Sequence, residues 1–216
     1  MATIDIAERN ALFLHIPKTA GWSVTSALQT AFPDAGVYPS RGIRSPKVGA
    51  AAHMAHRLGP DRLARRWTFC MIRNPWDWTV SGWIHVVRNK PAYDDPPTFR
   101  DFVLGAWRTG ATRNPHPKKY VDGSVFVAYH TQVTQDGHLR VGWRRRLAPI
   151  AFDARFERLQ DDWTRICERL GTDIHLPHRN RSDRDDYSSY YDDETREIVA
   201  RRNAPLIERF GYRFGE

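Results

Sequence analysis

The chain has 216 residues, a formal net charge of +8 at pH 7 and two cysteines. This length is enough for one full hydrophobic core, and two cysteines are too few for a disulfide-stapled scaffold. No apolar run has the length of a membrane span, and the first residues lack the basic-then-apolar layout of a signal peptide. We therefore expect a cytoplasmic protein without an integral membrane segment, formed by a single domain over residues 1–216.

The first predicted unit is a buried strand that enters a helix through a polar loop. Residues 12–16 form an apolar, strand-like run, and apolar residues recur at helical spacing from Val24 onward. Backbone N–H groups at the start of a helix have no partner within it, so a phosphate or sulfate suits this loop. The residues expected to hold the anion are Lys18, Thr19, Ala20, Gly21, Trp22 and Ser23.

A second unit of the same kind follows. Residues 67–72 form another apolar, β-prone run, which ends at Arg73, and a helix pattern follows that includes Ser81. A guanidinium offers a planar fork of donors that matches phosphate oxygens, and a hydroxyl adds another donor. Two anion sites on adjacent units predict one ligand with two phosphate groups.

The remaining elements are less regular until the C-terminal third. Residues 89–142 hold many prolines and glycines, and only residues 98–107 indicate a helix there, so this segment is where we expect acceptor recognition. A strand is predicted near Phe152, followed by a helix from Leu159 that ends at Gly171. Acidic residues from Asp192 mark a later helix start, and Pro205 ends or kinks that helix. Cys70 in a strand and Cys167 in a helix are expected to be buried thiols, with neither a disulfide nor a metal site.

At these residues the chain resembles the sulfotransferases that use 3′-phosphoadenosine 5′-phosphosulfate (PAPS), specifically the carbohydrate type related to heparan sulfate 2-O-sulfotransferase and its small bacterial relatives. The string His-Ile-Pro-Lys-Thr-Ala-Gly-Trp-Ser at 15–23 resembles the 5′-phosphosulfate loop, and Ile-Arg-Asn-Pro-Trp-Asp-Trp-Thr-Val-Ser at 72–81 resembles the 3′-phosphate motif. Further similar strings at 154–159, 176–182, 187–195 and 210–214 follow in the family's order. The resemblance thus covers nearly the whole chain.

This resemblance implies a three-layer α/β/α fold with a mainly parallel central sheet, of the kind shared with P-loop nucleoside triphosphatases. It implies transfer of a sulfuryl group from PAPS to an acceptor hydroxyl, with an anionic carbohydrate as the expected acceptor, leaving adenosine 3′,5′-bisphosphate (PAP) and needing no metal. Lys18 is implied to stabilise the developing charge, and His53 to be the general base, with His56 as the alternative. Asn180 and Ser182 are implied to be further donor contacts.

The family usually has Thr or Ser where Trp22 stands and often Arg where Trp78 stands. Losing the charge at position 78 either repositions the second motif or reflects local packing. A nucleoside triphosphatase is disfavoured, because Lys18 precedes the glycine and the pattern Gly-x-x-x-x-Gly-Lys-Ser/Thr is absent. The positive charge also suits nucleic acid, but basic residues are spread among acidic ones without a nucleic-acid motif, so no such partner is expected.

Three alternatives remain open. Taken alone, the first loop is compatible with an ordinary strand–helix turn and Arg73 with a structural ion pair. The chain is also compatible with a non-catalytic PAP- or glycan-binding module. Within the family, a small alcohol, a lipid or a tyrosine is an alternative acceptor. The sequence does not decide the oligomeric state.

Overall fold

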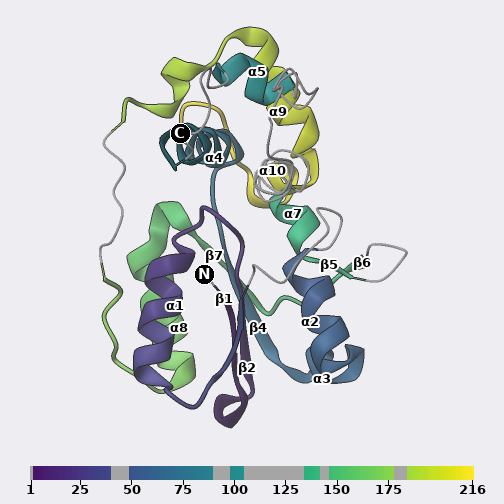
Figure 1. Ribbon diagram of the computed structural model, residues 1–216, viewed down its shortest axis with the longest axis vertical. Helices are drawn as coiled ribbons and strands as arrows, with labels where there is room; N and C mark the ends of the chain where they lie inside the picture. Colours follow the sequence, from purple (N-terminus) through teal and green to yellow (C-terminus); the bar gives the residue numbers. More distant parts are fainter. Residues whose placement is uncertain (1, 40–48, 90–97, 105–133, 142–145, 178–183) are drawn as a thin grey trace, which may run out of the picture. The chain divides into compact units, whose positions relative to one another are not determined.

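The computed structural model describes residues 2–39, 49–89, 98–104, 134–141, 146–177 and 184–216 (Figure 1). The chain divides into two compact units. The first comprises residues 1–44, 48–73 and 137–183, and the second comprises residues 45–47, 74–136 and 184–216. Each unit has its own cluster of buried apolar side chains. The single-domain organisation stays a prediction.

The first unit is built on a five-stranded sheet with the order β3-β1-β2-β4-β7. Its strands are β1 (Ala2–Ile6), β2 (Ala11–Leu14), β3 (Gly36–Pro39), β4 (Trp67–Ile72) and β7 (Phe152–Arg155). The pairs β2–β4 and β4–β7 are parallel, whereas β1 is antiparallel to both β2 and β3. The sheet is therefore mixed, whereas a mainly parallel sheet was predicted; the parallel arrangement holds for the part that contains β2, β4 and β7.

The short connection between β1 and β2 explains the antiparallel half. It consists of one 3-10 turn, η1 (Ala7–Arg9), and Asn10 in the left-handed conformation with φ 50°. Neighbouring parallel strands need a crossover connection of a dozen or more residues. A connection as short as this one therefore joins its two strands only as an antiparallel hairpin. Arg66 fixes this hairpin to the start of β4, because its guanidinium donates to the Asp5 carboxylate at 2.9 and 3.2 Å.

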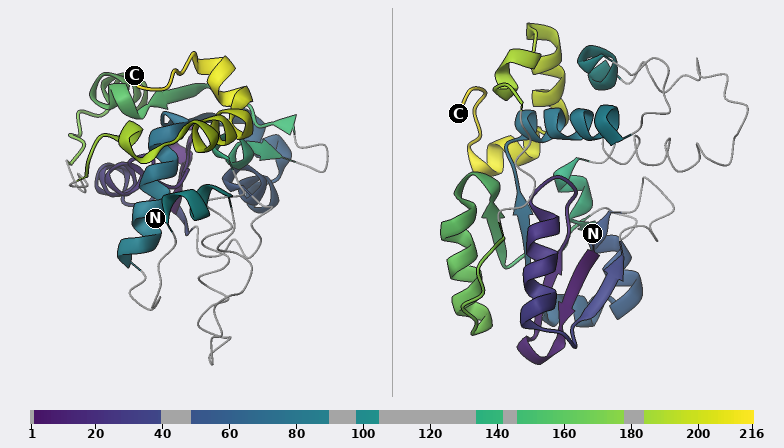
Figure 2. Two further views of the ribbon diagram at one scale, coloured as in Figure 1. Left: turned by 90° about the horizontal axis from the view of Figure 1, so that it is seen from above. Right: turned by 60° about the vertical axis from the view of Figure 1, so that its left-hand side comes forward.

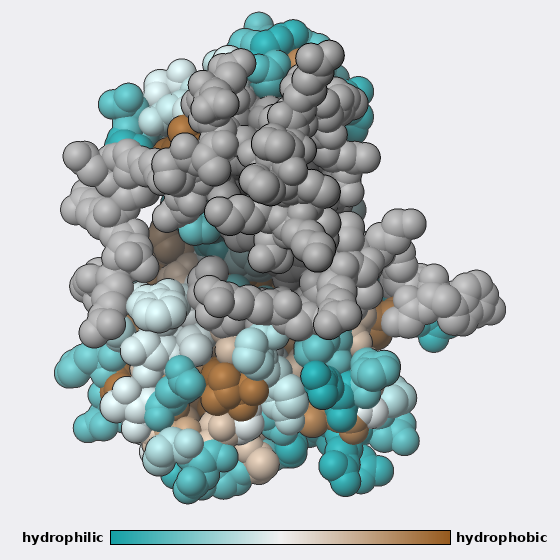
Figure 3. Space-filling view, viewed as in Figure 1, coloured by the Kyte–Doolittle hydropathy of each residue, from teal (hydrophilic) through white to brown (hydrophobic). Residues whose placement is uncertain are grey.

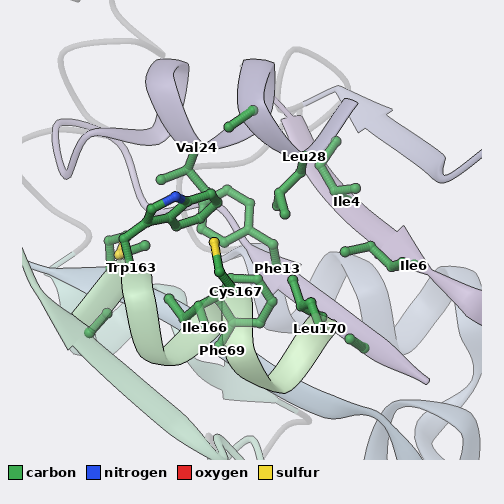
Figure 4. Packing of buried hydrophobic residues seen from close by; sticks show 14 of the residues in the cluster. Ile4, Ile6, Phe13, Val24, Leu28, Phe69, Trp163, Ile166, Cys167 and Leu170 are labelled. Atoms are coloured by element: carbon green, nitrogen blue, oxygen red, sulfur yellow. The ribbon is translucent and has the colours of Figure 1, made fainter. Parts of the chain in front are cut away.

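Helices cover both faces of this sheet. α1 (Gly21–Ala31) and α8 (Leu159–Leu170) lie on one face, and α2 (Ala50–Leu58) and α3 (Pro60–Arg65) lie on the other (Figures 1 and 2). Figure 4 shows Val24 of α1 and Ile166 of α8 converging on Phe13 of the sheet. The first unit is thus a mixed α/β structure whose core lies between the sheet and its covering helices.

Several sequence predictions for this unit are confirmed. The strand at 67–72 and the helix from Leu159 lie where predicted, and Gly171 ends α8 in the left-handed conformation with φ 66°. Cys70 and Cys167 are buried thiols. Shorter elements complete the unit, namely η4 (Phe156–Arg158) and an antiparallel pair of strands, β5 (Arg140–Val141) and β6 (Arg146–Leu147). The division between the units falls within α7 (Gln135–His138).

The second unit consists of helices around an aromatic cluster. Its elements are α4 (Pro75–Asn89), α5 (Phe99–Leu104), η5 (Tyr187–Tyr190), α9 (Asp193–Arg202) and α10 (Ala204–Phe210). A helix starts at the acidic residues from Asp192 as predicted, and Asp192 also caps it by accepting from the Thr195 N–H. The chain breaks between α9 and α10 at the position predicted from Pro205. Trp78 is 5% exposed, which supports local packing as the reason for this departure from the family pattern.

None of the helices in the described ranges combines the length and apolar character needed to cross a lipid bilayer. On the face shown in Figure 3, polar residues are interspersed with a few apolar ones over the described surface. Most of the irregular segment at 89–142 lies outside the described residues.

Candidate functional site

The loop between β2 and α1 (residues 15–20, the β2–α1 loop) has an unusual backbone. Lys18 and Ala20 both adopt positive φ angles, 67° and 63°, although neither is glycine. A left-handed conformation costs an L-residue about 1–2 kcal/mol, so other interactions must hold this loop in place. Strained backbone of this kind is concentrated at functional sites in proteins.

One of those interactions comes from Thr19. Its side chain is fully buried, and its hydroxyl donates to the carbonyl of Ile16 at 2.9 Å. The hydroxyl was expected to donate to a bound anion, but its hydrogen is used inside the loop. The structure therefore gives the Thr19 side chain a different role, which is to close the turn that carries Lys18.

The N-terminus of α1 presents its first amides without a side-chain cap. Ala20 is the N-cap residue, and the first intrahelical bond is from the Val24 N–H to the Ala20 carbonyl at 3.2 Å. The first turn contains no acidic residue, in contrast to α8 and α9. The N–H groups of Gly21, Trp22 and Ser23 therefore have no partner in the helix, and nothing in that turn neutralises the positive end of its dipole.

His15 fixes the entry into this helix. Its side chain is 1% exposed, and its backbone N–H donates to the Thr3 hydroxyl of β1 at 3.2 Å. A Cβ atom at Gly21 would lie 2.0 Å from Cδ2 and 2.2 Å from Nε2 of the His15 ring. Only glycine leaves room for the ring at this position. Gly21 is therefore required because the His15 ring approaches its Cα closely, and not because of its φ angle.

A second buried histidine lies against the start of α2. His138 is fully buried, and its backbone packs so tightly on Gly49 that a Cβ there would lie 2.5 Å from the His138 Cα. Gly49 is the N-cap residue of α2. Burial, and to a smaller extent the charge of His15, lowers the pKa of His138.

His53, the predicted base, lies in the second turn of α2. Its N–H donates to the Gly49 carbonyl at 3.0 Å, and its side chain is half-buried, whereas His56 is exposed. Partial burial, together with the nearby charges of Arg57 and His56, lowers the pKa of His53 below its usual 6.5. The ring is therefore neutral at pH 7 and able to accept a proton, which a general base requires.

Arg73 lies directly against the β2–α1 loop. It is 7% exposed, its Nη1 donates to the carbonyl of Lys18 at 3.2 Å, and its guanidinium lies 4.0 Å from the centre of the Phe156 ring. The structure thus brings together the two basic residues that sequence reasoning placed in separate motifs. It also shows that Arg73 holds the strained Lys18 backbone in place.

The N-terminus of α4 differs from that of α1. The Asn74 side-chain oxygen accepts from the N–H groups of Trp76 and Asp77 at 3.0 and 3.4 Å, and Arg184 forms an ion pair with Asp77. These amides are therefore already bonded, and a second anion would have to be held by side chains. Ser81, which was predicted for that role, lies in α4 of the second unit and is half-buried.

The remaining predicted residues have mixed outcomes. Ser23 is 5% exposed in the first turn of α1, whereas Trp22 beside it is 48% exposed. Asn180 and Ser182 lie outside the described residues. Within the described ranges, no three His, Cys, Asp or Glu side chains gather as a metal site would need. The absence of a metal requirement stays a prediction.

Sequence reasoning missed the supporting residues His15, His138, Asn74 and Phe156. Asn74 had a detectable signal, because Asn followed by Pro after a strand is typical of a helix N-cap with proline at the first helical position. The two histidines had no such signal, because they are 123 positions apart and local sequence does not show that both are buried in this unit.

We predict that Gly21→Ala lowers the free energy of unfolding by about 1–3 kcal/mol, the usual cost of forcing extra atoms into a packed site. Urea denaturation would measure the change. The double variant His15→Ala/Gly21→Ala should be affected less than the sum of the two single variants, because it removes the ring that the new methyl group meets. Strict additivity would contradict the proposed clash.

The buried histidines predict a pH dependence of stability. Burial lowers the pKa of both His15 and His138 to about 3, and their mutual repulsion adds to the effect on His138. Between pH 6.5 and 3 the unfolded chain therefore binds protons that the native state does not. The free energy of unfolding should fall with decreasing pH in this window, by up to about 1.4 kcal/mol per pH unit for each histidine.

Urea unfolding at a series of pH values would test this. His138→Gln should reduce the slope, and His175→Gln at an exposed position should leave it unchanged. A His138→Gln slope equal to that of the wild type would contradict the prediction.

Comparison with known proteins assigns the chain to no family, because no family model, curated protein or solved structure matches it. The resemblance to sulfotransferases therefore depends on the motifs quoted above, and the function is argued below from these motifs and the site geometry.

Proposed function

We propose that this protein transfers a sulfuryl group from PAPS to a hydroxyl group of a carbohydrate. The observation that carries the proposal is the hydrogen bond between Arg73 and the Lys18 carbonyl. It joins the two basic motif residues at the carboxyl ends of the neighbouring parallel strands β2 and β4. In open α/β sheets, ligands bind at this edge.

The N-terminus of α1 suits the 5′-phosphosulfate of the donor. Its uncapped first amides and unneutralised dipole favour a group with several anionic oxygens. Lys18 adds a positive charge beside them. A sulfuryl group carries less negative charge than a phosphoryl group, so a lysine and backbone amides are sufficient where kinases use magnesium.

In this proposal Arg73 and Ser81 hold the 3′-phosphate. The amides at the start of α4 are bonded to Asn74, so side chains must recognise this second anion. A guanidinium is the side chain best matched to phosphate oxygens. Arg73 then has two tasks, which are to hold the Lys18 backbone and to bind the ligand.

His53 is proposed to accept the proton of the acceptor hydroxyl. The acceptor oxygen forms a bond to sulfur while the bond between sulfur and the bridging oxygen of the donor breaks, and PAP leaves with that oxygen. Lys18 stabilises the charge that grows on the leaving group. The finer fold assignment, a sulfotransferase fold of the P-loop type, is part of this proposal and is supported by the strand–loop–helix order and the parallel β2–β4 pair.

We predict that PAP binds about ten- to a hundredfold more tightly than ADP, because a charge-assisted contact contributes about 1.5–3 kcal/mol. Calorimetric titration of both nucleotides would measure the ratio. Ser81→Ala should weaken PAP binding and leave ADP binding unchanged.

Arg73→Lys separates the two tasks of Arg73. If the variant loses only a phosphate contact, it should weaken the binding of PAP alone. If it disturbs the β2–α1 loop, it should weaken the binding of PAP and ADP equally. Equal wild-type affinity for PAP and ADP would refute the proposed pair of phosphate sites.

We predict that His53→Ala lowers kcat at least about a hundredfold with little change in PAP affinity, since a positioned base typically contributes a factor of 100 to 10,000. The wild-type rate should fall at acid pH with an apparent pKa below 6.5, because burial and neighbouring positive charge lower the pKa of His53. Sulfate-transfer assays across pH 5–8 would measure both effects.

His56→Ala is the matched control, because this residue is exposed one turn further along α2 and should keep near-normal turnover. The reverse result would move the base to His56. PAP binding without transfer to any acceptor in the wild type would favour the non-catalytic binding module.

A further inference from the structure

Trp22 is exposed in a way that the other described tryptophans are not. It is 48% exposed, whereas Trp76, Trp78 and Trp163 are 3–5% exposed and Trp67 and Trp83 are half-buried. Ring pairs involve several of these residues, but within the described ranges none involves Trp22. This exposure leaves the face of the indole accessible to a binding partner.

Trp22 lies at the end of α1 that follows the β2–α1 loop. It is the second residue of α1, and side chains in a helix lean toward the N-terminus and cover the turn before their own Cα. For a residue in the first turn, no helical turn precedes it. The indole therefore extends from the first turn of α1, two residues after the loop that carries Lys18.

We propose that Trp22 is the residue on which a sugar ring of the acceptor stacks, so that it determines specificity for cyclic over open-chain hydroxyl compounds. This inference rests on the proposed function, because it assigns the acceptor side of that same site. The C–H groups on one face of a pyranose carry partial positive charge, and they fit the negative face of an indole. Trp22 then orients the sugar while Lys18 and the α1 amides hold the donor.

The topology favours the acceptor over the adenine of the donor as the stacking partner. The proposed 3′-phosphate contact, Arg73, follows β4, which lies on one side of β2. α1 is fixed toward the opposite side, because the Thr25 hydroxyl donates to the Ala2 carbonyl of β1 at 3.1 Å. Trp22 precedes Thr25 by three residues, so the two side chains lie on neighbouring parts of the helix surface. The nucleoside thus extends toward β4, and Trp22 is on the β1 side of the loop.

The test combines binding with a site-specific signal. The protein is labelled with 5-fluorotryptophan, and the Trp22 resonance is assigned by its loss in Trp22→Phe. PAP-saturated protein is then titrated with an N-acetylheparosan tetrasaccharide, and separately with sorbitol as the open-chain control. Affinities for PAP and for the tetrasaccharide are measured for the wild type, Trp22→Ala, Trp22→Phe and Gln29→Ala, the last being an exposed site further along α1.

We expect the Trp22 resonance to shift with the tetrasaccharide and not with sorbitol. Trp22→Ala should weaken tetrasaccharide binding about tenfold and change PAP affinity less than twofold. Trp22→Phe should retain most of the affinity, and Gln29→Ala all of it.

Two results would overturn the inference. An unmoved Trp22 resonance, whether or not the sugar binds, would show that Trp22 does not contact it. A loss of PAP affinity in Trp22→Ala as large as the loss for the sugar would assign the indole to the donor. Failure of the proposed function is recognised separately, by a wild type that binds PAP no better than ADP, and the same titration without nucleotide then still tests Trp22.

Discussion

The geometry of the candidate site depends on the buried guanidinium of Arg73. A buried charge is costly unless polar groups compensate for lost water, and here the Lys18 carbonyl and the face of Phe156 contribute. The same bond offsets the cost of the left-handed Lys18 backbone. This hydrogen bond forms because β2 and β4 are parallel neighbours, paired at Leu14 and Cys70. The loops that follow the two strands therefore begin at the same edge of the sheet. The hydrogen bond from Arg73 thus acts both on the strained backbone of Lys18 and on the buried charge of Arg73.

A second constraint lies beneath the loop. The side chains of His15 and His138 are both buried; the His15 ring lies against Gly21, and the His138 backbone packs on Gly49. The starts of α1 and α2 are therefore each packed against a histidine residue whose lowered pKa keeps its ring neutral at physiological pH. The packing of His138 on Gly49 thus fixes the start of the helix that carries His53.

Much of the parallel half of the sheet was predictable from sequence, because apolar runs at residues 12–16 and 67–72 and the helical spacing after Val24 are local signals. β1 and β3 were not, since each is short and its place depends on pairing with another strand. Lys18 and Arg73 were identified from residue type and position, but their hydrogen bond depends on strand register. The Thr19 hydroxyl was assigned to a ligand because sequence does not reveal a bond to a carbonyl three residues earlier. Asn180 and Ser182 lie outside the described residues and stay predictions.

The Asn74 cap gives the N-termini of α1 and α4 different capacities for evolutionary change. At α1 the anion would be held largely by backbone amides, which every amino acid supplies, so substitutions there leave the donors in place as long as the loop keeps its shape. At α4 the amides are already bonded, so recognition depends on the identity of side chains. In the proposed function, recognition at α4 would therefore change through one or two codons, whereas the contribution of the α1 amides would diverge slowly.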